Sequence, residues 1–100
     1  MYYTYILRCE DNSLYTGITT DVNRRLEEHK SQSEKSAKYT RTHKATKLEI
    51  VWAADDRVLA SKLEYHIKKL PKSKKEQLLI TNDLENILGN KIERDKYTKI

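Results

Sequence analysis

Two tyrosines, one arginine and one histidine near the start of this 100-residue chain have the side chains and the spacing to form a reactive site. Tyr5 and Tyr15 stand ten residues apart, and Arg25 and His29 follow on one predicted helix. The core-facing stripe of that helix, at positions i, i+3, i+4 and i+7, consists of Val22, Arg25, Leu26 and His29. Because two of these four positions are basic, we interpret this face as the lining of a site.

Hydrolysis of a phosphodiester is a reaction that these side chains suit. It needs an activated water, neutralisation of developing charge and usually a divalent metal. A tyrosine hydroxyl can act as general base if its pKa falls from about 10, and Arg25, His29 and a metal-bound water nearby can lower it. Arg25 can also bind two phosphate oxygens at once. Glu64, on a later predicted helix, offers one hard oxygen ligand, so Mg²⁺ (or Mn²⁺) is expected to bind weakly without substrate.

Each of these residues also has a purely structural interpretation. A tyrosine in a half-buried strand is usually part of the core, and an inward-facing arginine often extends to a surface carboxylate. His29 near a helix C-terminus can stabilise the helix dipole. Glu64 and Lys68 have the spacing of an ordinary helical ion pair. The combination of these residues, and not any one alone, favours a site.

The first two predicted strands, residues 2–9 and 14–19, form a hairpin around a turn at residues 10–13. A loop centred on residue 11 or 12 pairs residues whose numbers sum to 22 or 24, which places Tyr5 and Tyr15 on one face of the sheet. A two-residue turn gives a sum of 23 and opposite faces, but the turn lacks the glycine that such tight turns favour.

Gly17 has a specific place in one of these registers. With a sum of 22, Gly17 lies across from Tyr5. Because glycine has no side chain, we expect open space above the tyrosine ring, where a ligand can approach.

The remaining elements follow from caps and breakers along the chain. The predicted order is a helix from the Thr20-Asp21 cap to about Lys30, a basic loop over 31–46, a strand over 47–54 and a helix from Asp55-Asp56 to Leu70 before Pro71. A capping-box spacing at Ser73–Glu76 predicts a further helix through Ile80, and residues 82–88 suit a short fourth helix closed by Gly89.

Composition indicates a single domain over residues 1–90 and a frayed tail over residues 91–100. Hydrophobic residues make up 37% of the chain and charged residues 35%, enough for one modest core. No apolar run approaches the roughly 20 residues that cross a bilayer, and the start lacks the features of a signal peptide. We therefore expect no association with membranes, and we also expect a monomer.

Cysteine and histidine usage adds two expectations. Cys9 is the single cysteine, so it cannot form an internal disulfide, and a reducing cytoplasm is expected. Its simplest role is that of a small buried hydrophobe at a strand end. One cysteine and three scattered histidines provide no ligand spacing for zinc.

The excess positive charge of the chain lies on one segment. Residues 30–47 hold six basic residues and one acidic residue, a net charge of +5, whereas the rest of the chain has 14 of each. This segment is expected to bind a polyanion, although a lysine-rich loop that only improves solubility is the alternative. Phosphate contacts without sequence preference are expected from Lys35, Lys38, Arg41 and Lys44. Tyr39, in the middle of the segment, can stack on an unpaired base.

The joint spacing of the candidate residues resembles that of the GIY-YIG nuclease superfamily. The two triplets of that pattern correspond to Tyr3-Thr4-Tyr5 and Tyr15-Thr16-Gly17, with Arg25 ten residues after Tyr15 and His29 four residues later. Glu64 matches the metal-binding glutamate of the family on the helix after the third strand. The likeness covers residues 2 to about 80, and the segments 38–41 and 67–70 are similar to a small, stand-alone branch. Tyr3 replaces the glycine of the first triplet and is expected to crowd the strand.

The resemblance implies a fold, an activity and a division of roles. The expected fold is α+β, a three-stranded antiparallel sheet flanked by three or four helices in the order β-β-α-β-α-α. The expected activity is Mg²⁺-dependent hydrolysis of nucleic-acid phosphodiesters, of DNA in preference to RNA, in repair, recombination or turnover. One tyrosine is implied to be the general base and the other a hydrogen-bonding residue; members differ in this assignment, and we favour Tyr5 as base.

Two further implications concern partners and the alternative function. Larger enzymes of the superfamily carry separate DNA-binding or partner domains, so a partner protein is a candidate for targeting this chain. The alternative is a nucleic-acid-binding module of the same fold without appreciable cleavage. The carboxylate of Glu64 favours the enzyme, because a binding module has no need of a carboxylate beside a phosphate path.

Overall fold

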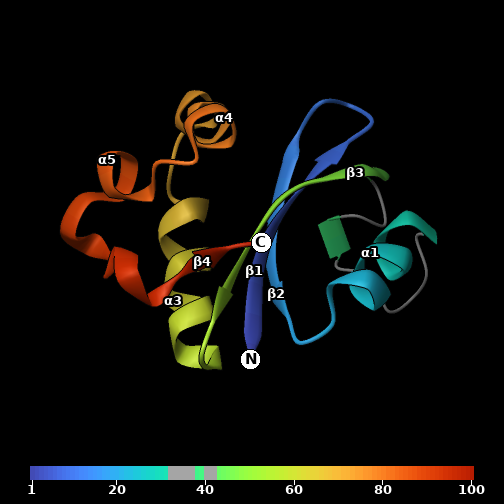
Figure 1. Ribbon diagram of the computed structural model, residues 1–100. Coiled ribbons are helices and arrows are strands. Elements are labelled where there is room, and N and C mark those ends of the chain that lie inside the picture. Colours follow the sequence, from blue (N-terminus) through green and yellow to red (C-terminus); the bar gives the residue numbers. More distant parts are fainter. Residues whose placement is uncertain (32–37, 40–42) are drawn as a thin grey trace.

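The computed structural model describes residues 1–31, 38, 39 and 43–100 (Figure 1). Its centre is an antiparallel sheet with the strand order β2-β1-β3-β4. The strands are β1 (Tyr2–Cys9), β2 (Leu14–Thr19), β3 (Ala45–Ala54) and β4 (Thr98–Lys99). The α+β class is therefore confirmed, but the sheet has four strands and not the predicted three, and the element order differs because a strand follows the last helix.

The hairpin of β1 and β2 has the register in which residue numbers sum to 22. Tyr5 pairs with Gly17, and Tyr3 pairs with Thr19. The backbone N–H of Cys9 donates to the carbonyl of Ser13 at 2.9 Å, which closes a three-residue loop. Asn12 completes that loop with a φ of 70°, a left-handed conformation that asparagine tolerates better than most residues.

Helices cover both faces of the sheet (Figure 1). One face carries α1 (Val22–Ser31), and the other carries α3 (Arg57–Lys68), α4 (Lys72–Thr81) and α5 (Leu84–Leu88). Because strand side chains alternate, β1 supplies both layers: Ile6 joins the larger core beneath α3, and Tyr5 and Leu7 join a smaller cluster beneath α1. The larger core is centred on Trp52, Leu63, Ile67, Leu78 and Leu84.

Two helix boundaries differ from the sequence prediction. Asp56 caps α3 as expected, since its carboxylate accepts from the N–H of Leu59 at 2.9 Å, but α3 ends at Lys68 and not at Leu70. The predicted capping box at the start of α4 is wrong: the helix begins at Lys72 after Pro71 and has no side-chain cap. Glu76, the expected reciprocal partner of Ser73, instead binds the guanidinium of Arg8 on β1 at 2.6 Å. A charge-assisted contact between layers is stronger than a neutral hydrogen bond at a helix end.

The last ten residues are ordered, so the predicted frayed tail is wrong. Short 3₁₀ turns at Gly89–Lys91 and Arg94–Lys96 lead into β4, which pairs with β3 at Trp52 and Ala53. Ile92 is 5% exposed and Tyr97 is 2% exposed, and the Tyr97 hydroxyl donates to the carbonyl of Leu59 at 2.7 Å. Ile92 and Tyr97 are isolated apolar residues that form no periodic pattern, so the sequence did not indicate their burial. That burial depends on surfaces made by distant segments.

The basic segment is described only in part. Lys35 and Arg41 lie outside the described residues; Lys38 and Lys44 are solvent-exposed, and Tyr39 is half-buried in a helical turn. Cys9 is buried at the end of β1, as expected of a small hydrophobe. Among the described residues, no helix combines the length and apolar character needed to cross a membrane.

Candidate active site

Tyr5 and His29 form the centre of a polar cluster on the α1 face of the sheet. The Tyr5 hydroxyl and Nε2 of His29 are 2.8 Å apart. Tyr5 is 2% exposed and His29 is fully buried, although both carry polar atoms. The contact joins the middle of β1 to the last turn of α1, so strand pairing and helix packing together fix its geometry.

Tyr15 extends this cluster toward the edge of the sheet. Its ring centroid lies 6.4 Å from that of Tyr5 and 5.2 Å from that of His29. On its other side Tyr39 stacks at 5.9 Å, and His43 stacks on Tyr39 at 4.0 Å. Tyr39, which we expected to stack on an unpaired base, therefore packs against a candidate site residue and belongs to the wall of the site.

Gly17 does not leave the open space that we expected above Tyr5. A Cβ atom at Gly17 would lie 2.6 Å from the Tyr5 hydroxyl oxygen and 3.0 Å from Cε2 of Tyr15. The Tyr5 hydroxyl therefore occupies the space that a side chain at position 17 would fill. Glycine is needed here so that the Tyr5 side chain can pass over position 17 of β2 and reach His29.

Replacing Gly17 by alanine is expected to displace the Tyr5 hydroxyl from His29. The new methyl group must move atoms of the buried Tyr5 and the half-buried Tyr15, which costs about 1–3 kcal/mol of unfolding free energy. Thermal denaturation measures that loss, and the tyrosine absorbance band reports the altered environment of Tyr5. Gly89→Ala is the matched control, since a Cβ there meets nothing within 4 Å although its φ of 60° adds strain. Wild-type spectra and stability in Gly17→Ala would contradict the close approach.

Arg25 lies on the same helix face and is held by a carboxylate. Its Nη1 atom is 2.9 Å from Oε1 of Glu28, three residues on. Arg25 is also close enough to Tyr5 to lower the pKa of the tyrosine hydroxyl. The guanidinium therefore faces the centre of the cluster while Glu28 balances its charge.

Glu64 approaches the cluster from α3, on the other layer. It is half-buried and pairs with Lys68, whose Nζ is 3.3 Å from Oε2 of Glu64 and 5.7 Å from the centroid of the Tyr15 ring. Because β2 is an edge strand, a long side chain from α3 can extend past it to Tyr15. Lys68 thus lies between two candidate site residues, although the sequence interpretation treated it only as half of an ordinary helical pair.

Burial dominates the electrostatics of the two central residues. It raises the pKa of Tyr5 above the usual 10, with Tyr15 adding to the rise, and Arg25 only partly offsets this. Burial also lowers the pKa of His29 from 6.5 to about 4, and the positive charge of Arg25 acts in the same direction. At neutral pH Tyr5 is therefore protonated and His29 is neutral, so Nε2 of His29 can accept the tyrosine proton in the tautomer that carries the ring proton on Nδ1.

The donor set suits a weakly held divalent ion. Within the described part of the chain, no group of three or more His, Cys, Asp or Glu residues is arranged to hold a metal. Glu64 offers a half-buried carboxylate whose charge raises the pKa of Tyr5, whereas Glu28, also half-buried, is paired with Arg25. A single carboxylate fits Mg²⁺ that keeps most of its waters and gains phosphate oxygens from a substrate.

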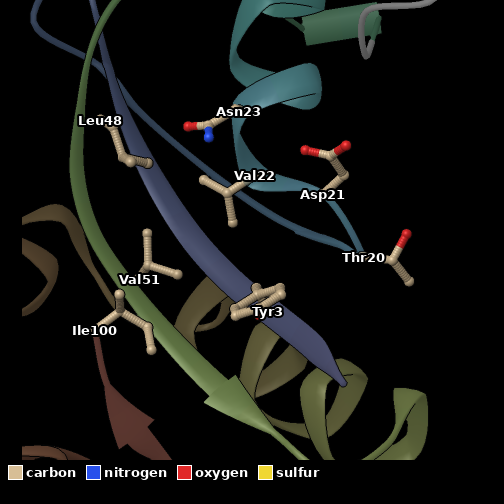
Figure 2. Close-up of a pocket in the computed structure, with 8 residues that line it drawn as sticks. All are labelled: Tyr3, Thr20, Asp21, Val22, Asn23, Leu48, Val51 and Ile100. Atoms are coloured by element: carbon tan, nitrogen blue, oxygen red, sulfur yellow. The ribbon is translucent and has the colours of Figure 1, made fainter.

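A cavity of about 460 Å³ lies on the same face but away from this cluster (Figure 2). It opens between the start of α1 and the sheet and is lined by Tyr3, Thr20, Asp21, Val22, Asn23, Leu48, Val51 and Ile100. The side chain of Tyr3 lies along its wall, so the bulk that replaces the family glycine is accommodated and does not crowd β1. The cavity is at the first turn of α1, whereas His29 is in its last turn.

The fold and the cluster agree with the comparison to known families. The family model of the GIY-YIG catalytic domain matches residues 1–77. Those residues include all of β1, β2, α1, β3 and α3, the elements that carry the cluster. The chain therefore belongs to the GIY-YIG family.

Within that family the chain is similar to small single-domain proteins named UPF0213. UPF0213 protein FN1575 of Fusobacterium nucleatum is 46% identical over 98 residues, which covers 93% of this chain and 96% of the relative. UPF0213 protein YhbQ of Escherichia coli O8 is 46% identical over 78 residues, covering 78% of this chain and 76% of the relative. The solution NMR structure of UPF0213 protein BH0048 from Bacillus halodurans has a TM-score of 0.51 at 48% identity, and covers 79% of this chain and 83% of that one.

Family membership has three functional consequences at a general level. It indicates nuclease activity, a nucleic acid as the molecule bound, and the dependence on a divalent metal that is general among GIY-YIG nucleases. Family membership does not specify the ion, the substrate or the roles of individual residues, which we infer below from the cluster around Tyr5 and His29.

Proposed function

We propose that this protein is an endonuclease that hydrolyses phosphodiester bonds with Mg²⁺ or Mn²⁺, acting on DNA in preference to RNA in repair, recombination or turnover. The observation that supports it most is the buried contact between Tyr5 and His29 at 2.8 Å, with Tyr15, Arg25 and Glu64 around it. A buried tyrosine that donates to a neutral histidine is a unit able to move a proton. The buried free Cys9 suits a reducing cytoplasm, and targeting by a partner protein is part of the proposal.

Arg25 is the proposed phosphate-binding residue. Its planar guanidinium can donate two parallel hydrogen bonds to phosphate oxygens. In the substrate-free protein the Nη1 group of Arg25 is engaged with Glu28, so an incoming phosphate competes with a carboxylate for that group. Until substrate arrives, the ion pair with Glu28 keeps Arg25 charged and in position.

Tyr5 and His29 are the proposed proton acceptor for the attacking water. As the water proton moves to the tyrosine oxygen, the tyrosine proton passes to Nε2 of His29, so the hydroxyl keeps one proton and the ring becomes cationic. The negative charge of a bound phosphate opposes the effect of Arg25 and raises the pKa of His29 toward the value that this transfer needs. The tyrosine is thus spared from becoming a buried phenolate, which burial disfavours.

The metal ion has a limited place in this scheme. Held by Glu64 together with waters and phosphate oxygens, Mg²⁺ or Mn²⁺ would neutralise charge that develops on the phosphate. Until then, Lys68 balances the carboxylate of Glu64. Tyr15 lies between His29 and Tyr39 and is proposed to orient the phosphate by a hydrogen bond.

A nucleic-acid-binding module without cleavage is the second candidate. The observation in its favour is that Tyr5 is 2% exposed, so a water must enter the cluster before its proton can be taken. Cleavage and binding are separable by experiment, because only cleavage requires the carboxylate of Glu64.

Incubation of the protein with branched, duplex and single-stranded DNA and RNA tests the proposal. We expect cleavage with Mg²⁺ or Mn²⁺, none with EDTA, and a loss of about 100-fold or more in Glu64→Gln. Glu85→Gln, an exposed glutamate on α5, is the matched control and should cleave like the wild type. Binding without cleavage under all metal conditions would instead support the second candidate.

A further inference from the structure

A second basic segment joins α3 to α4. Residues 68–75 contain five lysines and no acidic residue, a net charge of +5 that equals the charge of the whole chain. The residues outside 30–47 are neutral in total only because acidic residues elsewhere cancel the charge of this segment. The lysines are Lys68, Lys69, Lys72, Lys74 and Lys75.

Three of these lysines are engaged away from the cluster. Lys69 lies over the ring of Tyr65 at 4.8 Å. Lys72 donates to the carbonyl of Asn12 at 2.7 Å and lies near Glu76, and Lys74 is 3.5 Å from Oε1 of Gln77. All three of these lysines therefore contact residues outside the cluster around Tyr5 and His29.

Lys68 and Lys75 are different. Lys68 reaches the ring of Tyr15, and Lys75, in the first turn of α4, is half-buried and close enough to Lys68 to interact electrostatically. Within the described part of the chain, Lys75 has neither an ion pair nor a side-chain hydrogen bond. Burial and the charge of Lys68 both lower the pKa of Lys75, so this ammonium group is held at an energetic cost that an anion would relieve.

We propose that Lys68 and Lys75 form a phosphate-binding subsite beside Tyr15, which carries the nucleic-acid backbone from the cluster onto the junction of α3 and α4. Arg25 approaches Tyr5 from α1, and Lys68, with Lys75 beside it, approaches Tyr15 from the opposite layer, so phosphates on both sides of the tyrosines have cationic partners. Lys68 is paired with Glu64 only while no phosphate is bound.

The subsite rests on the proposed function in one respect, that the anion is a nucleic-acid phosphate. Lysine ammonium groups are point charges without a preferred donor plane, so they suit backbone phosphates and not base edges. The subsite therefore adds affinity without sequence preference, and it does so independently of the segment over residues 30–47.

Fluorescence anisotropy with duplex DNA in EDTA tests the subsite without any cleavage. The double variant Lys68→Gln/Lys75→Gln should bind about 10- to 100-fold more weakly near 0.1 M salt, and the slope of log K against log salt should flatten by about 2. Lys69→Gln/Lys74→Gln removes the same charge from neighbouring positions in the same basic segment and should keep nearly the wild-type slope. Lys68→Arg/Lys75→Arg should restore binding, which separates lost charge from a damaged fold.

Equal weakening in the two glutamine variants would overturn the subsite, because only net charge would then matter. A titration with inorganic phosphate, followed by NMR of the lysine ¹³Cε groups, separates the subsite from the proposed function. Shifts confined to Lys68 and Lys75 support the subsite even if the protein neither binds nor cleaves a polynucleotide. Equal shifts at Lys69 and Lys74, or none at Lys68 and Lys75, contradict it even if cleavage is observed.

Discussion

Tyr5→Phe is expected to lower the rate of phosphodiester cleavage by about 100- to 10,000-fold, the range for loss of a general acid–base group. The variant keeps the ring that packs beneath α1 and removes only the oxygen that lies 2.8 Å from Nε2 of His29. Single-turnover cleavage of a labelled substrate in Mg²⁺ or Mn²⁺ gives the rate, and anisotropy in EDTA gives the affinity, which should change little. The loss should therefore be in the chemical step and not in binding.

Tyr3→Phe is the matched control for this prediction. Tyr3 is on the same strand and the same face, but its side chain lines the separate cavity, so removal of its hydroxyl should leave the cleavage rate near that of the wild type. The Tyr5 variant leaves His29 without its hydroxyl partner, which costs about 1–3 kcal/mol of stability, and rates must be compared where both proteins are folded. A Tyr5→Phe enzyme as fast as the wild type would remove Tyr5 and His29 from the proton route and point to Tyr15 as base.

The stability of the wild-type protein is expected to fall by about 3 kcal/mol as the pH decreases from 6.5 to 4, because His29 is buried in its neutral form. The unfolded chain takes up a proton near pH 6.5, whereas the folded protein resists protonation of His29 down to about pH 4. Between these values the unfolded state binds more protons, so the unfolding free energy falls as the pH is lowered, and the contribution of neutral His29 is fully present only above about pH 6.5. Urea denaturation at a series of pH values measures it.

His29→Gln should remove most of this pH dependence, since an amide can still accept from Tyr5 but does not titrate. The groups that face His29 are Tyr5 and Tyr15 from the sheet and Arg25 and Glu28 from α1. His66→Gln is the control: the pKa of His66 is also lowered, by burial and nearby lysines, but His66 is only half-buried, and its removal should leave the larger part of the slope. An unchanged slope in His29→Gln would contradict a buried neutral histidine. Carboxylates with lowered pKa values, such as Glu76, act at lower pH, where their protonation breaks ion pairs.

Several elements follow from local signals in the amino-acid sequence. The hairpin, the helix after the Thr20-Asp21 cap and the cap at Asp56 follow from residue alternation, turn chemistry and side-chain oxygens next to backbone N–H groups. The register of the hairpin, and with it the placement of Tyr5 and Tyr15 on one face, was among the registers that the turn allowed. The spacing of the candidate residues also identified the family, because that pattern is carried by linear positions.

Other features depend on the tertiary structure, because long-range contacts there outweigh the local preferences of the chain. Glu76 binds Arg8 across the layers instead of capping its own helix, and the C-terminal segment forms a strand because β3 offers a free edge and Tyr97 finds a buried acceptor. The charge states of the site were equally beyond the sequence, since desolvation depends on what packs around a group. Arg25 beside Tyr5 suggested a lowered tyrosine pKa, yet burial outweighs that effect and leaves Tyr5 protonated beside a neutral His29.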